Sequence, residues 1–454
     1  MKRQRSRVRA VLAAVLAAVC VGTAAPGQAR AAGPGTYAFD PDATSVQGAT
    51  ANAEASELDE GVAYRSTIRR GEKLYYRVTL DDDSPAYVSA VAVPGDSGPV
   101  AYGDGITVSL RDLDDTRCGS QRATFGSGGY ARPITAYASR MPKEGSTVCQ
   151  QGGVYDVLVE RESKATSDTA AWDLELRFLK EPRPRSGASL PTEGPESWPS
   201  AAPEPPAEKP QKRSGGAGYF EATGLESGQW KDAVEPGQTR FYRVPVDWGQ
   251  QLHATARLSN SPDGTTEFVG NALTLSLDNP AGGNVADASL SYSGKPTTTS
   301  LRSLPPVAYR NRFASSAHVG AMRFAGWYYL SVSLSPELKQ AYGGEPIPLE
   351  LVVQVENDAT ESPYEEGGGV FGVTDRDKEM AREGQKAADA QEGGAMALVA
   401  ATGIGLGSVL VLGLGAWTLL ARRRAAQAPA AAADSSGPGG HRQPPPGGPP
   451  RQGW

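Results

Sequence analysis

Histidine, the side chain most often used as a general base, is scarce in this chain of 454 residues, which has three. His253 occupies a polar position of an alternating stretch, beside Thr255 and Arg257, and this pattern predicts an outward-facing strand position. His318 lies in a predicted loop ahead of Gly326. Because neither histidine has a serine and an acid that can be picked out as partners, the sequence predicts a protein that is not an enzyme. A hydrolase with an unrecognised site is the second alternative.

A glycine-rich segment, Gly95-Asp96-Ser97-Gly98-Pro99, resembles the nucleophile segment of chymotrypsin-like serine proteases. It departs from that family's pattern twice, because a second glycine before the proline is missing and all three histidines follow Ser97 in the chain. His441 falls, in addition, in a predicted cytoplasmic tail. We therefore interpret residues 94–98 as a turn that links two strands.

Acidic residues cluster at Asp81 to Asp83 and again at Asp112, Asp114 and Asp115, and carboxylate oxygens can hold calcium. The twelve-residue spacing with a central glycine that marks a calcium-binding loop is absent. We therefore expect solvated loop acids, and we predict neither a metal nor any other cofactor.

Three tryptophans, Trp230, Trp248 and Trp327, could offer the flat surface on which sugar rings stack. Trp327 abuts a predicted core strand and Trp248 follows one, so packing in the core also explains both. Binding of cell-wall glycan is therefore the first alternative function.

Two cysteines remain once Cys20 is removed with the predicted leader, and both are expected outside the membrane, where disulfides persist. We predict that Cys118 and Cys149 pair, which would close a loop of about 30 residues and stabilise the fold by roughly 3 to 4 kcal/mol. A reactive thiol or a metal site is the competing interpretation, although the set lacks a nearby histidine.

Four sequence blocks recur in the same order about 170 residues later. The strands that carry the residues discussed above are therefore expected in two copies. The matched pairs are 71–78 with 237–244, 106–110 with 273–277, 153–157 with 326–330, and 173–176 with 348–351. Such collinear matches indicate a tandem duplication with small loop insertions.

Each block alternates apolar with polar residues, the period-two pattern of a strand with one buried face. Turn signals such as Pro94-Gly95 and Gly343-Gly344 separate the blocks. The sequence predicts a mainly β protein with two tandem antiparallel β-sandwich or jelly-roll modules, and one C-terminal transmembrane helix. The predicted core residues are Ile106, Val108, Leu110, Tyr155, Val157, Val159, Leu174, Leu176 and Phe178 in the first copy, and Leu273, Leu275, Leu277, Tyr328, Leu330, Val332, Leu349, Leu351 and Val353 in the second.

A turn with Arg-Gly-Glu or Pro-Gly-Gln, then the strand Phe241-Tyr242-Arg243-Val244, then a late Gly-aromatic-Tyr strand at 326–332 resembles the bacterial pre-peptidase C-terminal (PPC) domain. The resemblance covers roughly residues 60 to 180 and 218 to 356. It implies small β-sandwich modules with an accessory, non-catalytic role. The chain departs from the family's usual setting, because it has no peptidase domain for the modules to accompany.

The predicted domains are module 1 at 46–180 and module 2 at 217–358, with a Pro-rich linker at 181–216 between them. That linker is expected to act as a semi-extended spacer. Residues 359–394 form a stalk in which a short helix is expected at 375–390. Residues 422–454 form a solvated Pro/Gly-rich tail, for which docking to a cytoplasmic proline-binding domain stays an alternative.

The two ends of the chain predict its location. Residues 1–31 have the basic start, apolar core and small-residue cleavage site of a signal peptide, with an uncleaved anchor as the alternative. Residues 395–421 carry no charge, and about 27 helical residues extend roughly 40 Å, more than the core of a bilayer of about 30 Å. Arg422, Arg423 and Arg424 follow as a stop-transfer signal that stays in the cytoplasm.

We therefore predict a non-catalytic, single-span type I membrane protein whose body binds or scaffolds outside the cytoplasm at a bacterial envelope. The expected partners are the membrane, other envelope proteins and, under the alternative, cell-wall glycan. A net charge of -6 and the lack of a basic stripe argue against nucleic acid.

Overall fold

A computed structural model describes residues 36–95, 99–143, 145–261 and 264–389. The chain divides into two compact units, Met1–Gln391 and Glu392–Trp454, and all described residues belong to the first. The predicted leader, the predicted span at 395–421, the three arginines after it and the tail lie outside the described residues. Among the residues that are described, no helix is both long and apolar enough to cross a membrane.

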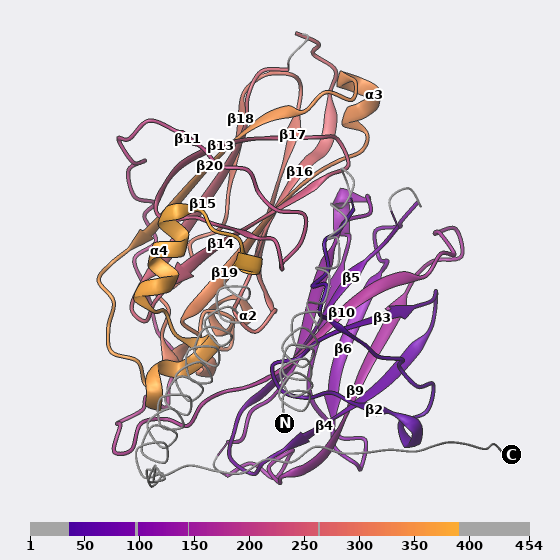
Figure 1. Ribbon diagram of the computed structural model, residues 1–454, viewed down its shortest axis with the longest axis vertical. Coiled ribbons are helices and arrows are strands. Elements are labelled where there is room, and N and C mark those ends of the chain that lie inside the picture. The colour runs from indigo at the N-terminus through magenta and orange to yellow at the C-terminus, as the bar shows by residue number, and fades with distance from the viewer. Residues whose placement is uncertain (1–35, 96–98, 144, 262–263, 390–454) are drawn as a thin grey trace, which may run out of the picture. The chain divides into compact units, whose positions relative to one another are not determined.

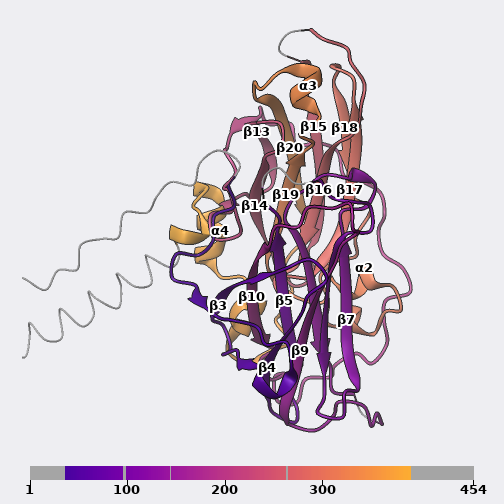
Figure 2. The same cartoon turned by 90° about the vertical axis from the view of Figure 1, so that its right-hand side faces the viewer.

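The first β-sandwich consists of two five-stranded sheets (Figures 1 and 2). One sheet has, in order, β1 (Thr44–Ser45), β3 (Ala63–Ile68), β10 (Trp172–Lys180), β5 (Ala86–Val93) and β8 (Ile134–Arg140). The other has β2 (Ser56–Glu57), β4 (Lys73–Leu80), β9 (Gly153–Glu162), β6 (Gly105–Arg111) and β7 (Arg117–Thr124). The two short N-terminal strands pair in parallel, and the other neighbours are antiparallel.

The second sandwich is likewise built from two five-stranded sheets. One has β11 (Gln211–Lys212), β13 (Gly228–Val234), β20 (Ile347–Glu356), β15 (Gln251–Leu258) and β18 (Thr297–Ser300). The other has β12 (Thr223–Gly224), β14 (Thr239–Val246), β19 (Gly326–Leu334), β16 (Val269–Asp278) and β17 (Asn284–Tyr292).

Strand for strand, the second sandwich repeats the first, because adding ten to every strand number of one converts its order into that of the other. Apart from the two short strands that open each copy, the order is that of a jelly roll. The register is repeated too: Tyr76 pairs with Val157, and its counterpart Tyr242 pairs with Leu330. The predicted tandem duplication is therefore visible in the topology.

Strand alternation places the cores where the sequence pattern predicts them. All eighteen predicted core residues are buried, with Ile106, Val108 and Leu110 of β6 and Leu273, Leu275 and Leu277 of β16 fully so. The reason is the pleat, which turns every second side chain of a strand to the same face. The prediction of two β-sandwich modules is confirmed.

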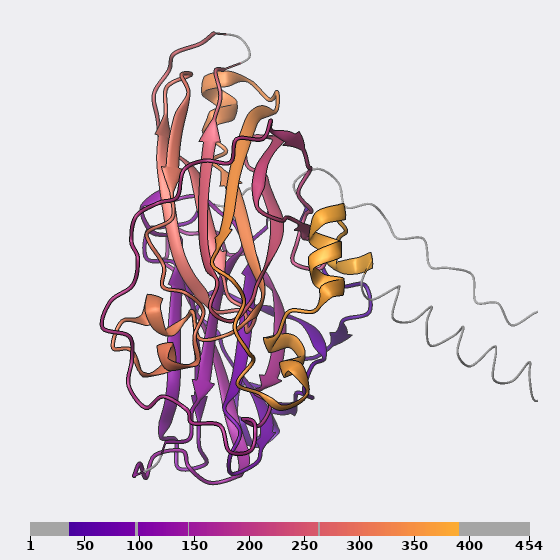
Figure 3. The same cartoon turned by 90° about the vertical axis from the view of Figure 1, so that its left-hand side faces the viewer.

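The predicted stalk contains the short helix expected in it, but this helix lies against the second sandwich. The helix, α4 (Asp375–Glu383), is drawn in orange-yellow in Figure 3. A capping box between Thr374 and Asp377 opens this helix. Its Met380 and Ala381 are buried, and the helix contacts β12 and β14 of the second sandwich. The helix is therefore docked by its apolar face.

The predicted spacer also lies against the second sandwich. Side-chain amides of Gln229, Gln251 and Gln354 donate to the backbone oxygens of Pro206, Pro199 and Glu204, over distances of 2.5, 2.8 and 2.6 Å. A proline lacks the N–H group but keeps its carbonyl, so glutamine donors suit a proline-rich segment. Residues 199–206 thus lie against the second sandwich, and the predicted linker does not act as a free spacer between the two.

Candidate functional site: a cleft between the sandwiches

The two histidines among the described residues, His253 and His318, occupy structural positions. His253 is half-buried on β15, between the buried Leu252 and Ala254, as its alternating pattern predicts, and burial lowers its pKa. His318 lies in a short helix, α2 (Ala317–Gly320), rather than in a loop, and its Nδ1 lies 2.7 Å from the backbone oxygen of Val285. Ser97 lies outside the described residues. No catalytic triad therefore forms around either histidine within the part of the chain that is described.

The acidic clusters organise loops. Asp81 Oδ1 accepts from the backbone of Asp83 and Ser84, and its pKa is lowered, because these bonds favour the charged carboxylate although burial acts against it. Asp112 accepts in the same way from Asp114 and Thr116. In the described ranges, no three or more histidine, cysteine or acidic side chains gather in a group that could hold a metal ion.

The three tryptophans do not form a platform. Trp230 and Trp248 are 3 % and 2 % exposed and belong to the core of the second sandwich. Trp327 is half-buried, carries the Arg243 guanidinium 4.0 Å above its ring and donates to Asp377 of α4. The platform interpretation is therefore wrong, because packing and the docked helix cover these rings.

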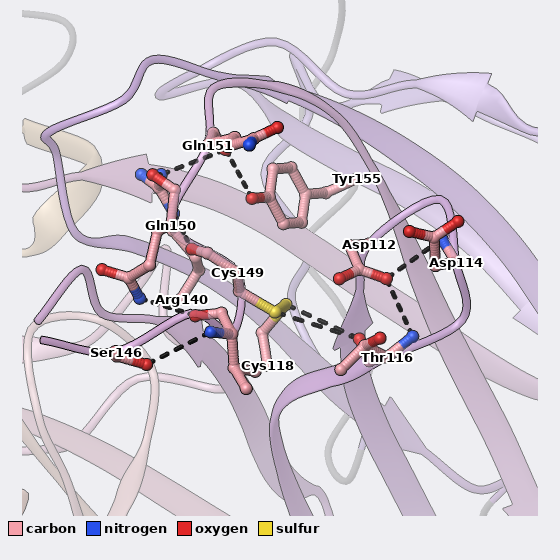
Figure 4. Close-up of a disulfide and its surroundings, with 11 residues drawn as sticks. Asp112, Asp114, Thr116, Cys118, Arg140, Ser146, Cys149, Gln150, Gln151 and Tyr155 are labelled. Atoms are coloured by element: carbon pink, nitrogen blue, oxygen red, sulfur yellow. Dashed lines mark hydrogen bonds between the residues drawn. A yellow bond between two sulfur atoms is a disulfide. The ribbon is translucent and has the colours of Figure 1, made fainter.

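Cys118 and Cys149 form a disulfide, as predicted (Figure 4). It ties β7 to the loop that precedes β9. The fully buried guanidinium of Arg140 holds the same loop, donating to the backbone oxygens of Cys149, Gln150 and Gln151. Its remaining donors bind oxygens of residues 81–84, so this end of the first sandwich is cross-linked twice.

The two sandwiches are in direct contact, and a buried polar cluster lies where they meet. Glu181, at the start of the predicted spacer, accepts hydrogen bonds from Tyr87 of β5, from Tyr364 at 2.8 Å and from Arg312 at 3.0 Å. The side chains of Arg312 and Glu181 are 3 % and 1 % exposed. This cluster joins the first sandwich, the predicted spacer, the second sandwich and the predicted stalk.

Two glycines allow a close approach beside this cluster. A Cβ atom on Gly283 would lie 2.4 Å from the ring of Tyr137 in β8, and one on Gly282 would lie 2.7 Å from Ser89 in β5. Only residues without a side chain fit here. The loop 279–283 of the second sandwich therefore reaches the sheet of the first.

Next to that loop lies a cleft with a volume of about 400 Å³. Its walls come from both sandwiches: strands β5, β8 and β10 on one side, and β14, β19 and the segments around residues 219 and 281 on the other. The polar and aromatic residues that line it are Asp40, Ser89, Thr135, Glu175, Arg177, Tyr219, Phe220, Arg243 and Tyr329.

A buried carboxylate lies in the wall formed by β10. Glu175 is 7 % exposed, and its Oε2 accepts a hydrogen bond of 3.0 Å from Tyr37. Burial raises the pKa of Glu175, an effect that the nearby Arg177 and the bond from Tyr37 oppose. Tyr37 itself packs edge-on against Phe241 of the second sandwich, so the N-terminal segment is part of the site.

A second carboxylate lies behind Tyr219, on the side of the second sandwich. The Tyr219 hydroxyl donates to Asp278 of β16 and lies 2.8 Å from the hydroxyl of Thr135 of β8. Burial raises the pKa of Asp278 to about 7, while hydrogen bonds from Tyr219 and Asn284 act in the opposite direction. Tyr219 also lines a smaller pocket of about 210 Å³ beyond it.

The last described residues close one side of the cleft. Ala387 and Ala388 donate backbone hydrogen bonds to the oxygens of Ala222 and Phe220, next to an isolated antiparallel bridge between Lys386 and Thr223 of β12. Arg243 of β14 donates to the backbone oxygen of Lys386 at 2.9 Å. Ala387 itself lines the cleft, which connects this wall to the segment that leads toward the predicted span.

Sequence reasoning missed every residue of this cleft. Tyr37 and Ala387 stand in segments that are predicted to be ends or connections, whereas Tyr219 stands at the start of predicted module 2. Glu175 and Arg177 are ordinary polar positions of an alternating strand. The usable signal is aromatic: Tyr37 and Phe39 precede predicted module 1, and Tyr219 and Phe220 follow the predicted Pro-rich linker.

Comparisons with known proteins give no family and only distant structural likenesses. No model of a known protein family matches the sequence, and no curated protein matches it. Among solved structures, the chain is similar to the N-terminal CBM22-1-CBM22-2 tandem domain of Xyn10C from Paenibacillus barcinonensis, with 15% identity, 63% of this chain and 83% of that chain covered, and a TM-score of 0.18.

The ANX1 ectodomain from Arabidopsis thaliana is similar with 9% identity, coverages of 64% and 84% and a TM-score of 0.18. An uncharacterized protein from Burkholderia cenocepacia is similar with 11% identity, coverages of 63% and 76% and a TM-score of 0.16. With TM-scores this low, none of these likenesses assigns a family or a ligand to the chain.

Proposed function

We propose that this chain is a non-catalytic, membrane-anchored binding or scaffolding protein that works outside the cytoplasm at a bacterial envelope, with the cleft between its sandwiches as the recognition site. The observation that carries the proposal is that both copies of the duplicated module contribute walls to one cleft. Its two modules are proposed to be PPC-like, on the motifs that resemble that family.

Location rests on the two ends of the sequence. A cleaved leader at 1–31 and a span at 395–421 followed by Arg422, Arg423 and Arg424 would leave the described body outside. The pairing of Cys118 with Cys149 agrees with an oxidising compartment. Among the described residues, Ala388 is the last with a backbone hydrogen bond to the segment that leads into the second sandwich, and it precedes the predicted span closely in sequence.

The chemistry of the cleft supports binding rather than catalysis. Its walls hold carboxylates, guanidinium groups, hydroxyls and aromatic rings, which together recognise a ligand through hydrogen bonds and ring contacts. Among the described cleft residues, no serine or threonine hydroxyl is hydrogen-bonded to a histidine that could activate it. Other envelope proteins and wall glycan are the partners this location would offer.

Cysteine labelling on intact cells tests the proposed topology. Glu345 is exposed on the second sandwich, so a Glu345→Cys variant should react with a membrane-impermeant maleimide in intact cells. A Ser435→Cys variant, matched to it in the predicted tail, should react only after lysis. Equal labelling of both, or labelling of residue 345 only after lysis, would overturn the proposal.

A further inference from the structure

The cleft between the sandwiches holds polar groups that the fold leaves with spare hydrogen-bonding capacity. The half-buried Arg177 has no side-chain hydrogen bond or ion pair with any described residue, although it stands next to the cleft in β10. Glu175 receives one side-chain hydrogen bond, from Tyr37, and a carboxylate can accept several. Glu175 therefore has unused acceptor sites next to a guanidinium with unused donors, and a ligand could bond to both.

The charges that line the cleft balance. Asp40 and Glu175 supply two carboxylates, and Arg177 and Arg243 supply two guanidinium groups. A cleft of this composition has no excess of either sign to attract a phosphate or a multivalent cation. It favours a neutral ligand that can both donate and accept hydrogen bonds.

The opposite wall supplies rings. Tyr219, Phe220 and Tyr329 of the second sandwich are each half-buried and line the cleft across from the polar residues of β10. The rings of Tyr219 and Tyr329 lie edge to face with their centroids 5.1 Å apart, so each ring helps to hold the other in place. Aromatic faces complement the C–H faces of a flat ring, whereas the hydroxyl edges of such a ring suit the carboxylates and arginines.

Size agrees with a small cyclic ligand. The volume of about 400 Å³ is at the lower end of the range of roughly 300 to 1,000 Å³ that ligand pockets have. We propose that this cleft binds a neutral saccharide of one or two rings, with Glu175 and Arg177 bonding its hydroxyls and Tyr219, Phe220 and Tyr329 packing against its ring. This inference rests on the proposed function and names the ligand class of the same site.

Isothermal titration calorimetry on the full chain in detergent tests the inference. The probes are N-acetylglucosamine, its β-1,4-linked disaccharide and glucose, with inorganic phosphate and lysine as charged probes. We expect saturable binding of at least one saccharide and none of the charged probes. Loss of one charge-assisted hydrogen bond in a Glu175→Gln or Arg177→Met variant should weaken that binding about tenfold or more.

Glu345→Gln is the matched control, because it removes an exposed carboxylate outside the cleft and should leave the affinity unchanged. Since Glu175 is buried, its variant is checked by thermal unfolding, and the half-exposed Arg177 provides a second variant that leaves the buried groups intact. No heat with any of the three saccharides, saturation by phosphate or lysine, or equal affinity in all variants would overturn the inference. The labelling test of topology is independent of these outcomes, so the two proposals fail separately.

Discussion

Replacing Glu181 by glutamine should lower the free energy of unfolding more than the removal of an exposed charge does, because Glu181 lies where the two sandwiches meet. The carboxylate of Glu181 is 1 % exposed and balances the Arg312 guanidinium, which is 3 % exposed. Removing the charge from one partner of a buried ion pair leaves the other charge uncompensated, and this costs about 3 to 5 kcal/mol. Tyr87 and Tyr364 also donate to this carboxylate, so their bonds weaken in the same variant.

The matched control is Asp173→Asn, which breaks the exposed pair between Arg65 and Asp173. Those side chains are 49 % and 38 % exposed, and exposed pairs contribute about 0 to 1 kcal/mol. Urea unfolding of residues 32–391, followed by tryptophan fluorescence, gives the free energy of unfolding of each variant. We expect a loss of about 3 kcal/mol or more for Glu181→Gln. If Glu181→Gln lowers the free energy of unfolding by no more than Asp173→Asn does, the cluster around Glu181 does not hold the two sandwiches together.

Three further changes have defined outcomes. Replacing Cys118 and Cys149 together by serine should lower the free energy of unfolding by about 3 to 4 kcal/mol, since their separation is 31 residues, and an unchanged urea midpoint would contradict this. Burial raises the pKa of Asp278 to about 7. The contribution of the protonated Asp278 side chain to the free energy of unfolding is therefore complete below about pH 4 and is lost as the pH rises through 7. Asp278→Asn should therefore flatten the dependence of stability on pH between 4 and 7, and parallel curves for the two proteins would exclude the raised pKa. Gly283→Ala places a Cβ atom against Tyr137 and should cost about 1 to 3 kcal/mol in thermal unfolding, whereas a neutral effect would show that the loop shifts freely.

The duplicated sandwich could be predicted from the sequence, because the alternation of apolar and polar residues in a strand is a local pattern. Ile106, Val108 and Leu110 alternate with polar residues, and their counterparts Leu273, Leu275 and Leu277 repeat the pattern. A pleated strand then turns these side chains into the core whatever the rest of the chain does. The order of the strands repeats for the same reason, since each copy carries the same blocks in the same sequence.

The buried cluster around Glu181 and the cleft could not be predicted from the sequence, because composition does not distinguish a free linker from a docked one. Glu181 and Tyr364 stand in Pro-, Gly- and acid-rich segments, yet both are buried where the sandwiches meet. Their partners, such as Arg312, are distant in sequence. Only the folded chain brings them together, since non-local pairing leaves no periodic trace.

The tryptophan platform failed for a related reason. Trp230 and Trp248 appear at polar boundaries in the sequence, but their rings lie in the core of the second sandwich. The rings that line a cleft are instead Tyr219, Phe220 and Tyr329. An aromatic side chain beside a strand therefore does not indicate on its own whether it packs inside or faces a ligand.

Photo-cross-linking in intact cells tests most directly that the cleft is a recognition site outside the cytoplasm. A photoreactive phenylalanine analogue replaces Phe220 in the cleft or, in a parallel strain, the exposed Glu345. The account predicts adducts with envelope components at position 220 and none at position 345. Equal yields at both positions, or no adduct at position 220, would contradict it.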